Sequence, residues 1–200
     1  MRSRHRKIIL SFLATLVIVT LGILSWAQLR YWQDTTSLFR HAAQVTVNNN
    51  IALRILGNNY GKLGHVSEAI DCLSQAVKIK PNDPIAHTDL GVALAEQQKY
   101  DEAIFHYMKA IQYNPKLANA YYNMGVALAY EHRYEEAINN YLEALRLDPS
   151  KRGVRANIGA ALLKVGKYYD AIYYLQEELR SDPNNEVVKE YLDNLLKGRL

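Results

Sequence analysis

A 34-residue period constrains the fold of this chain more than any other feature of its sequence. Small residues, prolines and bulky apolar residues each recur with that period. The recurring positions are Gly57, Gly91, Gly125 and Gly159; Ala69, Ala103, Ala137 and Ala171; Leu73, Tyr107, Tyr141 and Leu175; and Pro81, Pro115, Pro149 and Pro183. One such unit cannot bury its own apolar surface, so the pattern predicts a stack of similar units that share a continuous core.

The unit from Pro84 to Leu117 shows the pattern most clearly. It holds two amphipathic helical patterns, 85–97 and 101–114, separated by a short polar turn. Asp83 can cap the first helix, and Pro115 cannot continue the second. The other units give the same pattern, with first helices near 51–63, 119–131 and 152–164 and second helices near 67–80, 135–147 and 169–181.

Each set of positions spaced by 34 residues is here called a column. These columns resemble those of the tetratricopeptide repeat (TPR) family, which implies an all-α, right-handed α-solenoid of helix-turn-helix repeats. The predicted repeats are 50–83, 84–117, 118–151 and 152–185. Residues 30–49 are predicted to form half a repeat, with Phe39 and Ala42 in the columns of a second helix. Residues 186–200 restart the first-helix pattern, but Asp193 stands where the glycine would be, which predicts a polar cap helix.

The N-terminal segment predicts one transmembrane helix before the solenoid. Residues 1–7 are basic, and the uncharged stretch 8–29 would span about 33 Å as a helix, enough for a hydrocarbon core of about 30 Å. The positive-inside rule places residues 1–7 in the cytoplasm and the repeats on the extracytoplasmic side. The alternative is a secretory signal cleaved after Ala27, which would leave a secreted or periplasmic protein.

The junction AQLRYWQDTTSLFRHAAQVT, residues 27–46, resembles the C-terminal part of TPR-containing protein O-mannosyltransferase-like membrane proteins. This resemblance implies repeats on the extracytoplasmic side and an alternative function. The chain would then be the non-catalytic, substrate-recognising TPR portion of an O-glycosyltransferase-type membrane system, with a glycosyltransferase as a partner. The acidic catalytic loops of such enzymes have no counterpart in residues 1–7, so no catalytic residue transfers.

Charge and motifs exclude several other functions. Five of the 24 basic residues precede Tyr31 and no acid does, which leaves 19 basic against 20 acidic residues in the rest of the chain. Nucleic-acid binding needs a clustered basic face, so it is not expected. The single Cys72 excludes an internal disulfide and a cysteine metal site. The histidines lack ligand spacing and the glycines form no phosphate loop, so no enzyme activity, metal or cofactor is predicted.

The TPR resemblance places the first helices along a concave groove. Ile55, Asp89, Asn123 and Asn157 stand two residues before the repeated glycines. The last three resemble the asparagine ladder in the TPR region of nucleocytoplasmic O-GlcNAc transferases, where side-chain amides hold a peptide backbone. An amide offers both a donor and an acceptor, as a peptide group does. Tyr122 and Tyr130 are predicted to add apolar contacts to a partner.

Two other interpretations of the groove stay open. A chaperone-type carboxylate clamp suits Arg54 and Asn58, but Asp89 would repel a carboxylate and Asn119 replaces an expected base. Alternatively, the polar residues only solvate an open surface. The predicted function is a membrane-anchored TPR scaffold or adaptor that binds an extended peptide or a partner protein in its concave groove.

Overall fold

The computed structural model describes residues 16–26, 34–46 and 48–197, and within them the regular structure is helical, without strands. Residues 16–26 are helical, and ten further helices follow in the order α2 to α11. The helices are α2 (Thr35–Val45), α3 (Asn50–Lys62), α4 (Val66–Ile79), α5 (Pro84–Glu96), α6 (Tyr100–Tyr113), α7 (Ala118–Tyr130), α8 (Tyr134–Leu147), α9 (Val154–Lys164), α10 (Tyr168–Ser181) and α11 (Glu186–Leu196). The all-α solenoid predicted from the 34-residue period is confirmed.

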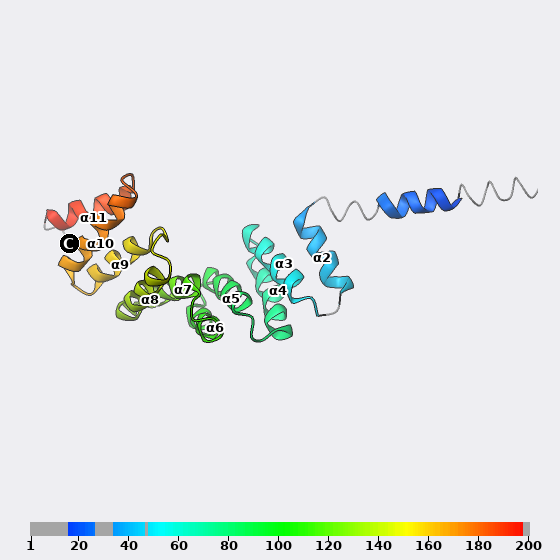
Figure 1. The fold of residues 1–200 in the computed structure, drawn as a ribbon, viewed down its shortest axis with the longest axis horizontal. Helices are drawn as coiled ribbons and strands as arrows, with labels where there is room; N and C mark the ends of the chain where they lie inside the picture. Colours follow the sequence, from blue (N-terminus) through cyan, green and yellow to red (C-terminus); the bar gives the residue numbers. More distant parts are fainter. Residues whose placement is uncertain (1–15, 27–33, 47, 198–200) are drawn as a thin grey trace, which may run out of the picture.

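The helices stack in antiparallel pairs along a curved array (Figure 1). The pairs α3–α4, α5–α6, α7–α8 and α9–α10 pack internally, and each pair packs against the next. First helices of successive pairs also contact one another: α3 with α5, α5 with α7, and α7 with α9. In Figure 1, α5 and α7 accordingly lie on the inner side of the curve, and α6 and α8 lie on the outer side.

The repeated glycines lie where the two helices of a pair come closest. A Cβ atom on Gly91 would stand 2.5 Å from Tyr107 Cε1, and one on Gly125 would stand 2.6 Å from Tyr141 Cε1. The two tyrosine rings fill this space and are buried, as are the alanines of the second helices. A residue with a side chain at the glycine position would have to displace a buried ring. The glycine column is therefore a packing requirement of the solenoid.

Two of the first helices, α3 and α5, begin where a short polar side chain caps them. Asp83 accepts hydrogen bonds from the backbone nitrogens of Ile85 at 3.0 Å and Ala86 at 3.3 Å, and Pro84 occupies the first turn of α5. Asn49 caps α3 in the same way, by accepting from the backbone nitrogen of Ala52. These caps set the starting points of α3 and α5.

The fourth repeat departs from the others. Its first helix, α9, begins at Val154 instead of at the predicted residue 152, after Gly153 in a left-handed conformation (φ 74°). The Gly153 N–H donates to Glu178 Oε1 at 3.2 Å. Glu178 is only 4% exposed and stands in a column that is alanine in the other repeats: Ala76, Ala110 and Ala144. A carboxylate from α10 thus caps the N-terminal end of α9, which favours negative charge.

Helix α2 is the second helix of an incomplete repeat. None of its residues is fully buried, although Phe39 and Ala42 share columns with the buried Leu73 and Ala76. Its packing partner among the described helices is α3, which covers one side only. The half-repeat is therefore less well packed than the four complete ones.

The predicted transmembrane helix, 8–29, overlaps the described residues only at 16–26. Its other residues, 8–15 and 27–29, lie outside the described part of the chain. No helix within 16–26, 34–46 or 48–197 is long and apolar enough to cross a membrane.

Candidate functional site

Two adjoining cavities run across the first helices α3, α5 and α7. The smaller has a volume of about 280 Å³ and the larger about 430 Å³. Both are lined by Val92 and Glu96 of α5, so they adjoin along this helix, and the two together are here called the inner groove. Its main lining residues are Asn58, Lys62, Asp89, Val92, Glu96, Tyr100, Tyr107, Asn123, Val126 and Tyr130.

Asp89 ties α5 to α3 at the smaller cavity. Its Oδ2 accepts from Asn58 Nδ2 at 2.8 Å and from Arg54 Nη1 at 3.2 Å. The Arg54 and Asp89 side chains are 24% and 20% exposed, so their ion pair is partly shielded from solvent. The two groups that would suit a carboxylate clamp are therefore engaged by Asp89 within the protein.

A similar link joins α7 to α9. Asn157 Nδ2 donates to the Tyr122 hydroxyl at 3.1 Å. The Lys151 ammonium lies 4.9 Å from the centre of the Tyr122 ring and donates to Asn119 Oδ1 at 2.6 Å. Tyr122, Asn157 and Asn119 thus belong to an inter-repeat network, and two of the three ladder positions, Asp89 and Asn157, have partners inside the protein.

Asn123 is the exception, and its surroundings explain why. The Asp89 and Asn157 side chains bind residues 35 or 31 positions earlier, on the preceding first helix. The corresponding residues for Asn123 are Thr88 and Val92. Thr88 Oγ1 donates to the Pro84 carbonyl at 2.8 Å, and Val92 is apolar. Among the described residues the Asn123 amide therefore has no hydrogen-bond partner, and it lines the larger cavity.

Tyr130 lies at the rim of the larger cavity. Its side chain is 62% exposed, and its ring stacks on Tyr100 with a centroid separation of 4.9 Å and an interplanar angle of 2°. Of the predicted site residues, Asn123 and Tyr130 thus line the larger cavity, whereas Arg54, Asn58, Asp89, Asn119, Tyr122 and Asn157 make contacts between repeats.

Six of these lining residues were not predicted: Lys62, Val92, Glu96, Tyr100, Tyr107 and Val126. Asp89, Val92 and Glu96 are spaced as one stripe of a helix, so the sequence contained this signal. Tyr107 is buried, yet its hydroxyl makes no hydrogen bond with any described residue, and the residue lines the larger cavity. Burial, together with the nearby charge of Glu96, raises the pKa of the Tyr107 phenol, which stays protonated at neutral pH.

The structure also brings together two histidines. His87 Nε2 donates to the Pro81 carbonyl at 2.9 Å, and its Nδ1 lies 2.9 Å from His106 Nδ1. A carbonyl only accepts, so His87 carries a proton on Nε2; with that tautomer its Nδ1 accepts from His106 Nδ1. Burial, and then the neighbouring His87, lower the pKa of His106 to about 4. Within the described part of the chain, no three His, Cys, Asp or Glu side chains are grouped as metal ligands.

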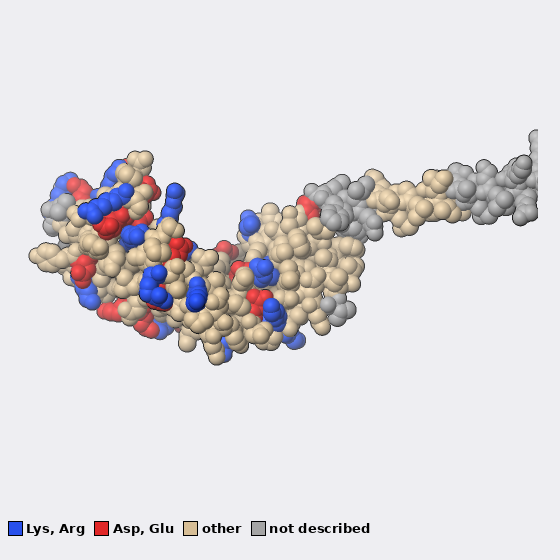
Figure 2. Space-filling view, in the orientation of Figure 1, with Lys and Arg blue, Asp and Glu red and all other residues tan. Residues whose placement is uncertain are grey.

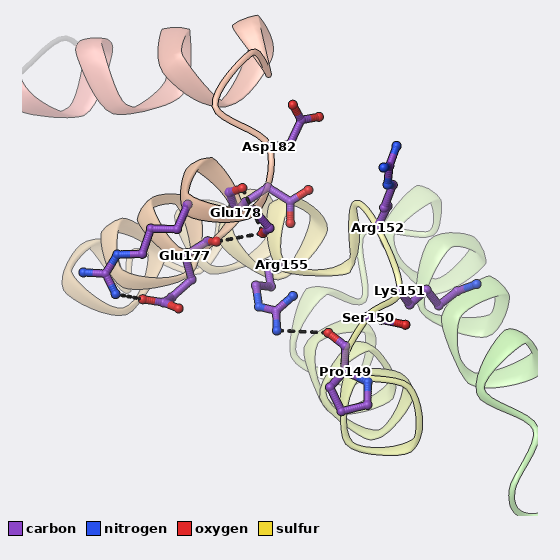
Figure 3. Close-up of a pocket in the computed structure, with 10 residues that line it drawn as sticks. Pro149, Ser150, Lys151, Arg152, Arg155, Glu177, Glu178 and Asp182 are labelled. Atoms are coloured by element: carbon purple, nitrogen blue, oxygen red, sulfur yellow. Dashed lines mark hydrogen bonds and ion pairs between the residues drawn. The ribbon is translucent and has the colours of Figure 1, made fainter.

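Another cavity, of about 460 Å³, lies between the α8–α9 loop and the C-terminal end of α10 (Figure 3). Most of its charged side chains form ion pairs or hydrogen bonds within the protein. Glu177 pairs with Arg180, Arg155 Nη2 donates to the Pro149 carbonyl at 3.1 Å, and Glu178 caps α9. Lysines, arginines and carboxylates are also interspersed over the face shown in Figure 2. The inner groove has polar groups without partners among the described residues, so it is the stronger candidate for ligand binding.

Comparisons with known proteins agree with this architecture. The "TPR repeat" family model matches residues 57–98 and 93–130, and the "Tetratricopeptide repeat" model matches 118–151. The structure of MamA is similar in fold, with 24% identity, a TM-score of 0.68 and coverage of 74% of this chain and 86% of that one. The first TPR of Spaghetti (RPAP3) bound to an HSP90 peptide has 25% identity, a TM-score of 0.59 and coverage of 62% and 98%.

No curated protein matches the chain. The resemblance of residues 27–46 to O-mannosyltransferase-like proteins finds no support in these comparisons. The structure of pilF from Pseudomonas aeruginosa is 30% identical, with a TM-score of 0.68, and the alignment covers 74% of this chain and 68% of that one. With the repeat models and this relative in agreement, the chain belongs to the tetratricopeptide repeat family.

Proposed function

We propose that this chain is a membrane-anchored scaffold whose inner groove binds an extended segment of a partner protein. The observation that carries the proposal is the Asn123 amide, which has no partner among the described residues and lines one of two adjoining cavities on three first helices. TPR solenoids are suited to protein–protein interaction, and the related Spaghetti repeat is bound to an HSP90 peptide.

The groove offers two kinds of contact to an extended segment. The Asn123 amide can donate to and accept from one peptide group, which satisfies both without regard to the partner's side chains. The exposed Tyr130 ring, held against Tyr100, gives a rigid apolar surface at the rim. A carboxylate clamp is disfavoured, because Arg54 would have to leave Asp89 before it could bind a terminal carboxylate.

Replacing Asn123 by alanine is expected to weaken partner binding by about tenfold, the equivalent of roughly 1.4 kcal/mol from lost hydrogen bonds. Asn123 has no partner within the described residues, so the fold should keep its stability. The measurement is the yield of crosslinked partners in cells, quantified by mass spectrometry. Asn139→Ala is the matched control, because Asn139 is exposed on α8 and lies outside both cavities. Equal yields for the two variants would exclude the groove as the binding site.

We further propose that residues 8–29 anchor the chain, with residues 1–7 in the cytoplasm and the repeats on the extracytoplasmic side. The basic segment before an uncharged stretch of this length supports that orientation. Protease added to intact spheroplasts is expected to digest the repeats, and the intact mass of the protein should include residues 1–29. Protected repeats would contradict the orientation, and a mature N-terminus at Gln28 would show that the segment is a cleaved signal.

A further inference from the structure

We infer that the larger cavity of the inner groove binds a basic side chain, arginine or lysine, of the partner segment. This inference rests on the proposed function, because the cavity is part of the same groove. It adds the chemical class of the residue that the groove selects.

The charge of the cavity favours a cation. Glu96 is the only ionisable acid or base among the lining residues apart from tyrosines, so the cavity carries one negative charge and no lysine or arginine. Glu96 is exposed and forms no ion pair or hydrogen bond with any described residue. Asp89 adds no free charge nearby, because Arg54 neutralises it, and the cation Lys62 lines the smaller cavity but not the larger one. An incoming cation would therefore meet an unpaired carboxylate.

The neutral polar groups of the cavity can complete such a site. The Asn123 side-chain oxygen and the Tyr107 hydroxyl oxygen can accept from N–H groups, and neither has a partner among the described residues. A guanidinium has five N–H donors and an ammonium has three, so either can serve several acceptors at once. An aliphatic ligand side chain would instead cover these groups without giving them hydrogen bonds, which is costly.

The apolar walls fit the stem of a long basic side chain. Val92, Ala95, Val126 and Ala127 line the same cavity of about 430 Å³. Lysine and arginine side chains pack their methylene groups on apolar surface while the charged end remains in a polar setting. The face of the Tyr130 ring that is not stacked on Tyr100 can contact a cation. An acidic side chain would meet the charge of Glu96 and would gain no cation–π contact.

The test uses the full chain in detergent, labelled with ¹⁵N, and short capped peptides that differ only in a central arginine, lysine, leucine or glutamate. In NMR titrations the arginine and lysine peptides are expected to shift the signals of Glu96, Asn123 and Tyr130. They should bind about tenfold more tightly than the leucine or glutamate peptide. Added salt should weaken only the binding of the basic peptides.

Glu96→Gln removes the charge and keeps the shape of the side chain, so the preference for arginine over leucine should fall about tenfold. Glu131→Gln is the matched control, since Glu131 is exposed and lines neither cavity. The inference is overturned if the glutamate peptide binds as well as the arginine peptide, or if Glu96→Gln keeps the preference. If Asn123→Ala then still weakens the binding of all the peptides, the inner groove remains the binding site and only the preference for a basic side chain is wrong. If no peptide shifts the groove signals, both proposals fail.

Discussion

Replacing Ala137 by leucine is expected to lower the melting temperature of the protein by several degrees. Ala137 is fully buried on α8, and its carbonyl oxygen lies 3.2 Å from the position that a Cβ on Gly125 would occupy. Three more carbon atoms have no room at this closest approach of α7 and α8. Overpacking of this kind costs about 1–3 kcal/mol, and each kcal/mol corresponds to roughly 2–4 °C in a chain of this size.

The control for this change is again Asn139→Ala on the exposed face of α8, where substitutions usually alter stability by less than about 0.5 kcal/mol. Thermal melts followed by circular dichroism compare the two variants with the parent protein. Gly125→Ala offers a second test, because its Cβ would stand 2.6 Å from Tyr141 Cε1 in a buried site. Equal melting temperatures for Ala137→Leu and Asn139→Ala would contradict the close approach of α7 and α8 at Ala137.

Acidification from pH 7.5 to pH 5 is expected to destabilise the second repeat through His106. The pKa of this imidazole is about 4 in the folded protein, against an ordinary value of 6.5. Between these values the unfolded chain binds a proton that the folded chain does not, so stability is full above pH 6.5 and falls as the pH drops toward 4. The full shift corresponds to about 3 kcal/mol, and solvent screening of the half-buried ring reduces this to about 1–2 kcal/mol.

Urea melts at several pH values measure this dependence, and the range above pH 5 leaves exposed carboxylates ionised. His106→Asn is the matched variant, because Asn140 occupies the corresponding position in the next repeat. It cannot titrate, so its stability should change less with pH than that of the parent protein. The same loss in both proteins would mean that another group, and not His106, is responsible for the pH dependence.

Most of the fold could be predicted because the repeated columns report contacts inside each unit. Glycine, alanine and the bulky residue of each repeat meet within one helix pair, so their period locates the pair directly. The helices begin within about one residue of the predicted positions, apart from α9. The first residue of α9 follows Gly153, whose N–H donates to Glu178 on α10. Because Glu178 lies on another helix and replaces the alanine of its column, the pattern within α9 could not predict this contact.

The site was less predictable, because it depends on contacts between units. The sequence placed Asp89, Asn123 and Asn157 in one column and treated them alike. The structure separates them according to the residues one repeat earlier: Arg54 and Asn58 engage Asp89, Tyr122 engages Asn157, and no described residue engages Asn123. Likewise, His87 and His106 come from different helices of one repeat, so neither sequence pattern revealed their pairing. Partner binding at the predicted residues stays a prediction.

The open side of α2 has a mechanical consequence. In a solenoid each helix pair is held only by its neighbours, so a pull on the N-terminal end loads the repeats one after another. Helix α2 meets that load first, and it has no fully buried residue, whereas α3 and α4 each have three. Under tension α2 would therefore peel away before the complete repeats open. The N-terminal end would then move away from the repeats while the inner groove on α3, α5 and α7 keeps its shape.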